Sequence, residues 1–327
     1  MNEAVDRLPG NDIALALYQR MLLVRRMEEM LGEIQKTGVL PGPVHLYIGQ
    51  EAVAAGVCAH LDDHDWIAST HRGHGHFLAK GGDPAKMAAE IYGRADGICS
   101  GKGGSMHVAD FSKGILGANG IVAGGIGLAV GAALAAQLDG RGRVAVAFFS
   151  DGAANQGVLS EALNIGALWR LPLVLVCENN GFCEFSPTET VTSGAISDRA
   201  TPFGVPGVAV DGNDAFAVWA AAGEAVERAR HGGGPTLIEA HTYRTRGHVE
   251  YEVTFLSEKY RADEEVDAWL QRDPIPSLAQ RLLERGVARE ELAALEESAR
   301  AAAEQAYRYA EASAWPNAAQ AHTDMFA

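Results

Sequence analysis

The second half of the chain alternates uninterrupted apolar runs with helical stretches, and this alternation limits the possible folds more than any other feature. Four strands are expected, at residues 144–150 (VAVAFFS), 173–179 (LVLVCEN), 208–210 and 236–244. Continuous apolar runs of this kind are typical of strands buried on both faces. Helices are expected between them at 155–170 and 214–230, the second capped by Asp214. The pattern predicts an α/β fold with a doubly wound, mostly parallel sheet, which binds ligands at the carboxyl ends of its strands.

The rest of the chain divides into regions of different character. We expect an N-terminal helical segment over 1–40, a ligand-binding domain over 41–260 and a C-terminal helical region over 261–327. Residues 12–36 carry apolar side chains at helical spacing and predict one long helix. The Ala- and Glu-rich stretch 289–312 predicts another, which is either a solvated surface helix or a subunit contact.

Charge and cysteine usage exclude several classes of function. The 27 basic and 42 acidic residues give a net charge of -15, so neither nucleic acid nor an anionic membrane surface is expected as a partner. The chain has 4 cysteines and no C-x-x-C pair, which predicts reduced thiols and a cytoplasmic protein.

One uncharged stretch, residues 121–138, is long enough to span a bilayer. Its many glycines and alanines make it only weakly hydrophobic, and they allow close approach of another helix. We therefore expect a buried, closely packed helix there and no membrane span.

Two polar motifs follow the two strongest strands. Ser150-Asp151-Gly152 ends the first strand, and Asn179-Asn180 ends the second. If these strands are neighbours, the Asp151 carboxylate and the Asn180 amide oxygen converge at one edge of the sheet, and such oxygen ligands suit Mg²⁺. Taken singly, each motif also fits a helix cap or a turn.

The combination of SDG and NN, separated by 26 residues, resembles the fingerprint with which thiamine-diphosphate proteins hold the cofactor's diphosphate through Mg²⁺. The longer string SDGAANQGVLSEALNIGALWRLPLVLVCENNGF is similar to E1 α subunits of 2-oxo acid and acetoin dehydrogenase complexes. Further similar segments occur in the same order, so that the resemblance covers roughly residues 15–275: VHLYIGQEA (44–52), STHRGHGHFLAKG (69–81), GKGGSMHVAD (101–110), LGANGIV (116–122) and TYRTRGH (242–248).

This resemblance implies a site for thiamine diphosphate and Mg²⁺. The implied metal ligands are Asp151, Asn180 and the carbonyl of Phe182. The groups implied at the diphosphate are the N–H groups of Gly152 and Ala153 and the side chains of Arg72 and Arg244, and His71 and His248 are further residues expected to bind the cofactor. Gly120 and Val122 would cradle the aminopyrimidine ring, and His74 and His248 would be active-site histidines beside the reacting carbon.

Other interpretations of these residues stay open. His71, His74 and His76 could form a zinc site or lie exposed on a loop, although Arg72 among them disfavours a cation. The segment GKGGS (101–105) lacks the spacing of a nucleotide-binding P-loop, and Gly125-Ile126-Gly127 lacks that of a nicotinamide fingerprint.

The resemblance also implies partners. The glutamate that activates the aminopyrimidine comes from a separate β subunit in this family, so the chain is expected to be half of an active site in an α₂β₂ assembly. Acyl transfer to a lipoyl group would require an E2 partner. Glu51 and Glu161 are candidate carboxylates within the chain, with capping or surface roles as the alternative. Rival functions are a non-catalytic subunit that binds cofactor or partner, and a stand-alone lyase or transketolase-like half protein.

Several positions depart from the family pattern. Ser150 replaces the first glycine of the fingerprint, Arg246 replaces a histidine of pyruvate-type members, and Val249 replaces a serine that mitochondrial members phosphorylate. The segment 249–259 departs most. If Glu250 and Glu252 face the pocket, their charge disfavours an anionic 2-oxo acid and favours a neutral acyloin such as acetoin. The expected substrate is acetoin or a 2-oxo acid.

Overall fold

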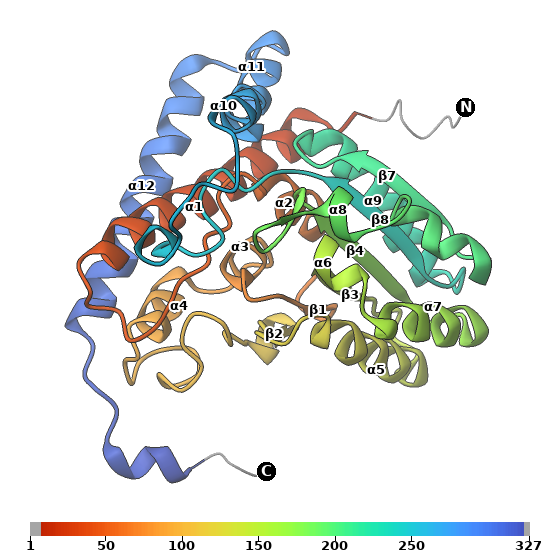
Figure 1. Ribbon diagram of the computed structural model, residues 1–327, viewed down its shortest axis with the longest axis horizontal. Coiled ribbons are helices and arrows are strands. Elements are labelled where there is room, and N and C mark those ends of the chain that lie inside the picture. The colour runs from red at the N-terminus through yellow and green to blue at the C-terminus, as the bar shows by residue number, and fades with distance from the viewer. Residues whose placement is uncertain (1–7, 324–327) are drawn as a thin grey trace.

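The computed structural model describes residues 8–323, in which a parallel sheet is covered by helices on both faces (Figure 1). The main sheet has six strands in the order β2-β1-β3-β4-β8-β7, and every neighbouring pair is parallel. The strands are β1 (Trp66–Ala68), β2 (Ile115–Gly117), β3 (Ala145–Ser150), β4 (Leu173–Asn179), β7 (Gly207–Asp211) and β8 (Thr236–His241). The predicted fold class is confirmed.

Helices and a small hairpin complete the architecture. The α-helices are α1 (Asn11–Lys36), α2 (Glu51–Cys58), α3 (Gly73–Ala79), α4 (Pro84–Ile91), α5 (Gly124–Asp139), α6 (Asp151–Ala154), α7 (Gly157–Trp169), α8 (Thr188–Val191), α9 (Ala215–Arg230), α10 (Asp263–Leu270), α11 (Pro274–Glu284) and α12 (Arg289–Ala312). The 3₁₀ helices are η2 (Phe111–Lys113), η3 (Ser197–Phe203), η4 (Glu252–Thr254) and η5 (Ala318–His322). The hairpin pairs β5 (Phe182–Cys183) with β6 (Ser186–Pro187).

Alternate side chains of the central strands fill two different cores. On β3, Val146 and Phe148 join a core with side chains of α1, α2, α9 and α12. Ala145, Ala147 and Phe149 join the core on the other face, with α5 and α7. Successive residues of a strand face opposite sides of its sheet, so the continuous apolar run VAVAFFS is needed to fill both cores.

The strand order places the sheet's switch point between β1 and β3. The chain passes from β1 to β2 on one side and then returns to form β3 on the other side of β1. In doubly wound sheets the loops at such a point diverge and leave a crevice at the carboxyl ends of the strands. The loops that follow β1 and β3, beginning at Ser69 and Asp151, are therefore where a ligand is expected.

The terminal helices pack together (Figure 1). Helix α1, red in the figure, contacts α12, blue in the figure, and α12 also contacts α4. The buried face of α12 is built from Leu292, Ala299, Ala303, Ala306, Tyr307 and Ala310. This face makes an intramolecular contact, which neither of the two expectations for 289–312 had included. The predicted boundaries at 40 and 260 stay predictions, and residues 1–7 and 324–327 of the outer two regions lie outside the described residues.

Helix α5 is buried on one face only. Ile126, Ala129 and Ala133 lie in the core beneath the sheet, whereas Gly127 and Leu128 are exposed. The expectation of a fully buried helix was thus half right. Within residues 8–323, no helix is both long enough and apolar enough to cross a membrane.

The structure differs from the sequence-based expectation in other elements too. Strands β1 and β2, of three residues each, were not expected. Strand β8 ends at His241, so that residues 242–244 leave the sheet. The helix expected from 155 begins at Gly157, since the short α6 and a break at Asn155 precede it.

Candidate functional site

The predicted site residues follow the carboxyl ends of four neighbouring strands. His71 and Arg72 follow β1, Asp151 follows β3 and Asn180 follows β4. Arg244 follows β8, the next strand across. Strands β3 and β4 pair directly, with Ser150 opposite Glu178. The condition on which the Asp151 and Asn180 prediction depended, that their strands are neighbours, is therefore met.

Asp151 is a buried carboxylate that lacks a positive partner. Its side chain is fully buried, Oδ2 accepts a hydrogen bond from the Thr188 hydroxyl, and Oδ1 has no hydrogen-bond partner among the described residues. Burial raises the pKa of the Asp151 carboxyl above its usual value. Burying a carboxylate oxygen without a donor is costly, so this atom fits a bound cation.

Asn180 and Phe182 begin the loop that also carries Thr188, the residue whose hydroxyl donates to Asp151. The Asn180 side-chain oxygen accepts the Phe182 N–H at 3.2 Å, and its Nδ2 donates to Gln50 Oε1 at 3.2 Å. A cavity of about 720 Å³ adjoins this side of the site and is lined by Asn180, Phe182 and Thr188 among others. The candidate metal ligands here are oxygen atoms, which Mg²⁺ prefers in proteins.

The turn at Gly152 and Ala153 is tight. A Cβ atom on Gly152 would lie 2.5 Å from the Cys183 Sγ atom, so a larger residue would have to displace the Cys183 side chain on β5. The Ala153 N–H donates to the Ser150 Oγ atom at 3.2 Å. The serine that replaces the first fingerprint glycine thus occupies one of the two N–H groups expected at the diphosphate.

Two buried arginines follow β1 and β8, the outer two of these four strands. Arg72 donates to the Leu46 carbonyl at 2.8 Å and the His248 carbonyl at 2.9 Å. Arg244 donates to the Tyr260 hydroxyl at 2.7 Å and to the Glu184 carbonyl. Burial, together with the nearby Arg244, lowers the pKa of Arg72 to about 9.

Neither Arg72 nor Arg244 forms a salt bridge with a carboxylate among residues 8–323. Both side chains are at least 96% buried, with relative exposures of 4% and 1%. Two buried cations without a counter-ion fit a site for an anion with more than one negative charge.

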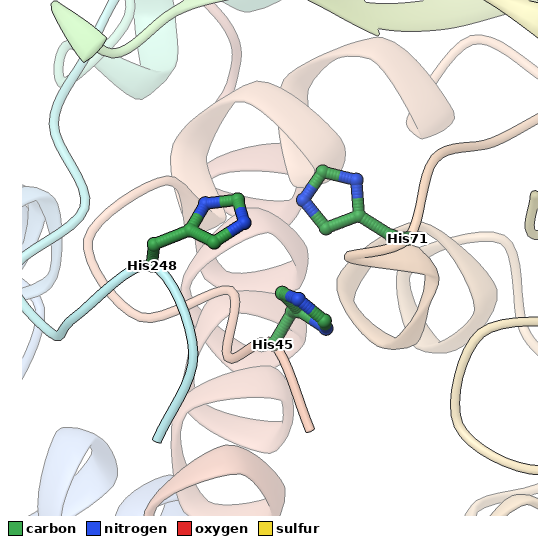
Figure 2. A group of neighbouring side chains, drawn as sticks. All are labelled: His45, His71 and His248. Carbon is green, nitrogen blue, oxygen red and sulfur yellow. The ribbon is translucent and has the colours of Figure 1, made fainter. Parts of the chain in front are cut away.

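Three histidines meet beside these arginines (Figure 2). His45, His71 and His248 have ring centroids 4.7 to 5.5 Å apart, and each offers a nitrogen within 4.8 Å of the others. Burial and Arg72 lower the pKa of His45 to about 3 and that of His248 to about 2, and they also lower the pKa of His71 well below its usual value. The three rings are therefore neutral near pH 7.

Neutral imidazoles can bind a metal ion, but the surroundings of His248 oppose it. Its Nδ1 atom lies 3.2 Å from an Nη atom of Arg72, so this nitrogen faces a guanidinium group. If Nδ1 accepts that hydrogen bond, the neutral ring carries its proton on Nε2, which then cannot be a ligand. The cluster suits a polar or anionic group better than a cation.

His45 was not among the residues singled out from the sequence. It lies two residues before Tyr47 in a segment without regular secondary structure, and only its place within VHLYIGQEA pointed to it. His45, His71 and His248 are far apart in the chain. Their contact is therefore visible only in the folded structure.

The zinc site considered for His71, His74 and His76 is wrong, because the three side chains point to different partners. His74 is fully buried and contacts Glu28 Oε1 at 2.8 Å and the Ser105 hydroxyl at 3.0 Å. His76 contacts Ser69 Oγ at 2.7 Å and Glu178 Oε1 at 3.1 Å. Both nitrogens of each ring are engaged. The position of His74 therefore does not support the direct catalytic role expected for it.

The remaining predicted residues vary in exposure. Gly120 and Val122 are exposed, Val122 by 57%, and leave room for another group to cover them. Glu51 is buried, where it binds Arg25 at 2.5 Å and the Gly49 N–H at 3.0 Å. Glu161 lies on the exposed side of α7. Neither glutamate is a free carboxylate within the crevice.

The electrostatic argument for a neutral substrate is not supported. Glu250 forms an ion pair with Arg246 at 2.5 Å, so its charge is compensated. Glu252 accepts the His248 N–H at 2.5 Å and the Tyr260 hydroxyl at 3.3 Å. Tyr260 also accepts a hydrogen bond from Arg244, so a neutral hydroxyl links Glu252 to Arg244 without a direct ion pair.

The glycine-rich segment 101–105 binds an anion that belongs to the chain itself. The buried Glu90 carboxylate accepts backbone N–H groups of Cys99, Gly101, Gly103 and Gly104 at 2.6 to 3.1 Å. A concave run of N–H groups is a ready anion site, and here a glutamate fills it. The segment is therefore structural.

Within residues 8–323, fold and site together are those of an α/β protein in which a buried carboxylate oxygen without a hydrogen-bond partner and two buried arginines follow neighbouring parallel strands. A sequence profile of the dehydrogenase E1 component family matches residues 18–319. The chain belongs to the dehydrogenase E1 component family, and the predicted resemblance is confirmed.

Several relatives are similar over nearly their whole length. The α subunit of acetoin:2,6-dichlorophenolindophenol oxidoreductase from Bacillus subtilis is 50% identical, over 96% of this chain and 93% of that protein. The subunit of the same name from Cupriavidus necator is 46% identical, over 95% and 93%. The pyruvate dehydrogenase E1 component α subunit of Zymomonas mobilis is 40% identical, over 95% and 88%.

Proposed function

We propose that the chain is the α subunit of a thiamine-diphosphate-dependent E1 dehydrogenase that cleaves acetoin or a 2-oxo acid. The acyl unit would pass to a lipoyl group on an E2 partner. One observation carries the proposal. A buried, unpartnered Asp151 oxygen lies at the same sheet edge as two buried arginines that have no acidic partner. A metal ion bound to a diphosphate would satisfy both at once.

We assign the metal and diphosphate ends as follows. Asp151, Asn180 and the Phe182 carbonyl would hold Mg²⁺. Gly152, with no side chain in the way, would offer its N–H to the diphosphate, and Arg72, Arg244 and His71 would neutralise its charge. Ala153 would join only if its N–H leaves the Ser150 hydroxyl. Gly120 and Val122 would pack against the aminopyrimidine ring.

The reacting end would lie at the histidine cluster. Bound thiamine diphosphate supplies a thiazolium carbon that can add to the substrate carbonyl. His248 and His45 are neutral near pH 7, so each ring can accept a hydrogen bond at one nitrogen and donate one from the other. His74 would act from a distance, through the groups it holds in place.

A β subunit would complete the site. Glu51 is engaged by Arg25 and Glu161 lies on an exposed helix face, so neither can reach an aminopyrimidine in the crevice. We propose that the activating carboxylate comes from an E1 β chain in an α₂β₂ assembly. A cytoplasmic location belongs to the same proposal, and the 4 free cysteines support it.

Similarity favours acetoin over pyruvate as the substrate. The two acetoin-named relatives are 50% and 46% identical to the chain, and the pyruvate-named relative is 40% identical. The test is dye reduction by the chain mixed with a matching β subunit, with acetoin, pyruvate or a branched 2-oxo acid. We expect activity that requires both subunits, Mg²⁺ and thiamine diphosphate, and that is highest with acetoin.

Each other outcome contradicts a separate part of the proposal. Higher activity with pyruvate would reject the substrate preference alone. Acyloin formation by the chain without a β subunit would favour a stand-alone lyase. Cofactor binding without turnover by the pair on any of these substrates would favour a non-catalytic subunit.

A further inference from the structure

The backbone N–H and the side-chain hydroxyl of Tyr47 each donate a hydrogen bond to a buried carboxylate. The side chain is fully buried, its hydroxyl donates to Glu178 Oε1, and its backbone N–H donates to Glu28 Oε2 at 2.7 Å. Glu178 lies on β4 and Glu28 on α1, so the tyrosine connects the sheet to the N-terminal helix.

A histidine fixes each of these carboxylates. His74 contacts the second oxygen of Glu28 at 2.8 Å, and His76 contacts Glu178 at 3.1 Å. Gly75, between the two histidines, packs directly against the tyrosine, because a Cβ there would lie 2.1 Å from the Tyr47 ring. Tyr47 is therefore enclosed by α3 as well as by the two carboxylates.

The segment that contains Tyr47 reaches both ends of the candidate site. Residues 44–50 have no helix or strand, so side-chain and loop hydrogen bonds must hold their backbone. His45 belongs to the histidine cluster, the Leu46 carbonyl accepts from Arg72 at 2.8 Å, and Gln50 Oε1 accepts from Asn180 at 3.2 Å.

We propose that Tyr47 is a positioning residue. Its hydrogen bonds to Glu28 and Glu178, which together we call the clamp, fix the backbone of residues 44–50 and so the positions of both His45 and Gln50. His45 would be placed at the reacting end and Gln50, through Asn180, at the metal end. The residue itself touches neither cofactor nor substrate. The part of this inference that concerns activity rests on the proposed function, whereas the part that concerns the segment does not.

The segment is tested by hydrogen exchange of the chain without any ligand. Tyr47→Phe removes the hydroxyl and keeps the ring, and Tyr307→Phe is the matched control, because that buried hydroxyl donates to the Met27 carbonyl at 2.9 Å. We expect amide exchange of residues 44–50 to accelerate about tenfold in Tyr47→Phe, as loss of a hydrogen bond to a charged group implies, with no change there in Tyr307→Phe. Unchanged exchange in Tyr47→Phe overturns the proposal.

Glu178→Gln separates the hydrogen bond from the charge. Glutamine keeps an oxygen that can accept the Tyr47 hydroxyl, so exchange of residues 44–50 should stay slow. Fast exchange in Glu178→Gln combined with slow exchange in Tyr47→Phe overturns the clamp. If the single Tyr47→Phe variant does not fold, the double variant Tyr47→Phe/Glu178→Gln replaces it in the exchange experiment. The second substitution removes the Glu178 carboxylate, which would otherwise have lost its hydrogen bond from Tyr47.

Activity of the α/β pair then tests positioning at both ends. Tyr47→Phe should raise the apparent Kd for thiamine diphosphate with Mg²⁺ and lower kcat, each by about tenfold, while Tyr307→Phe changes neither. A change in stability with Kd and kcat intact would mean a structural role only and would overturn the proposal. If the unaltered pair binds no thiamine diphosphate, the proposed function fails, and the exchange experiment still decides the clamp.

Discussion

Asp151 and Arg72 are both buried charged residues without an ion-pair partner among the described residues, and their charges are opposite. Because an unpaired buried charge lowers stability, these residues are better suited to binding than to holding the chain together. Each can be tested without knowledge of the substrate.

Asp151→Asn should stabilise the chain in the absence of ligand. Burial raises the pKa of the Asp151 carboxyl, so the folded chain holds this proton more tightly than the unfolded chain does. The ionised group therefore costs stability as pH rises through the raised pKa, and nothing is lost below the usual value near 4. The variant should gain about 1 kcal/mol or more at pH 7 and less at pH 4, measured by urea unfolding.

The matched control for this prediction is Asp214→Asn. Asp214 caps α9 through the N–H groups of Phe216 and Ala217 and forms a partly exposed ion pair with Arg281 at 2.6 Å, so asparagine keeps the cap and loses only the ion pair. We expect it to lower stability by less than about 1 kcal/mol at either pH, the opposite sign to Asp151→Asn. A less stable Asp151→Asn chain at pH 7 would contradict the interpretation of Asp151 as an unpaired charge.

The histidine cluster should make the chain sensitive to mild acid. The folded-state pKa values of His45, His71 and His248 are depressed, so unfolding takes up protons as pH falls below about 6.5. Stability present at pH 7 is then progressively lost towards pH 4. The variant His45→Asn/His71→Asn/His248→Asn should show a smaller loss of unfolding free energy over this range. His231→Asn, at an exposed ion pair, should retain the full loss.

At the scale of elements, the turn at Gly49 closes the segment onto the loop after β8. Its φ is +101°, and a Cβ atom would lie 2.3 Å from the Tyr243 carbonyl oxygen. Gly140 at the end of α5 also has a positive φ, +65°, but its Cβ would meet nothing within 4 Å. Comparing the two separates steric overlap from backbone strain.

Gly49→Ala should therefore destabilise the chain by at least about 2 kcal/mol more than Gly140→Ala, because alanine at 49 adds overpacking to the shared cost of a positive φ. Urea unfolding of both variants gives the comparison. Equal losses would show that the loop after β8 can move away from residue 49.

The sequence allowed the central elements to be predicted well. Strand β4 occupies the predicted range 173–179, and β3 begins one residue later than expected, because continuous apolar runs are unambiguous. The N-cap of α9 at Asp214 is confirmed by its two side-chain hydrogen bonds. Strands β1 and β2 escaped prediction because three residues cannot show a periodicity.

Most residues of the candidate site could be predicted from the sequence, but the contacts among their side chains could not. Asp151, Asn180, Arg72 and Arg244 follow neighbouring strands, which strand order alone makes possible. His45 was missed, and the contacts of His74 with Glu28 and Ser105 were not predicted, since the sequence does not tell which way a side chain on a loop or on α3 points. The pairing of Glu250 with Arg246 depends equally on side-chain direction.

On the scale of the whole molecule, a well-packed core supports a crevice in which several groups have no partner within residues 8–323. The core that contains α1 and α12 also contains sheet residues such as Val146 and Val176, so the terminal helices and the sheet share one core. The crevice, by contrast, leaves buried charges unpaired and Val122 exposed. The proposed binding of a cofactor and a β chain would account for both.

The central claim is tested most directly by calorimetric titration of thiamine diphosphate into the α/β pair, with and without Mg²⁺. We predict binding that needs Mg²⁺ and that weakens at least about 100-fold in Asp151→Asn, as loss of a charged metal ligand implies. Asp214→Asn should bind like the unaltered pair. Binding of equal strength without Mg²⁺, or undiminished binding by Asp151→Asn, would contradict the account.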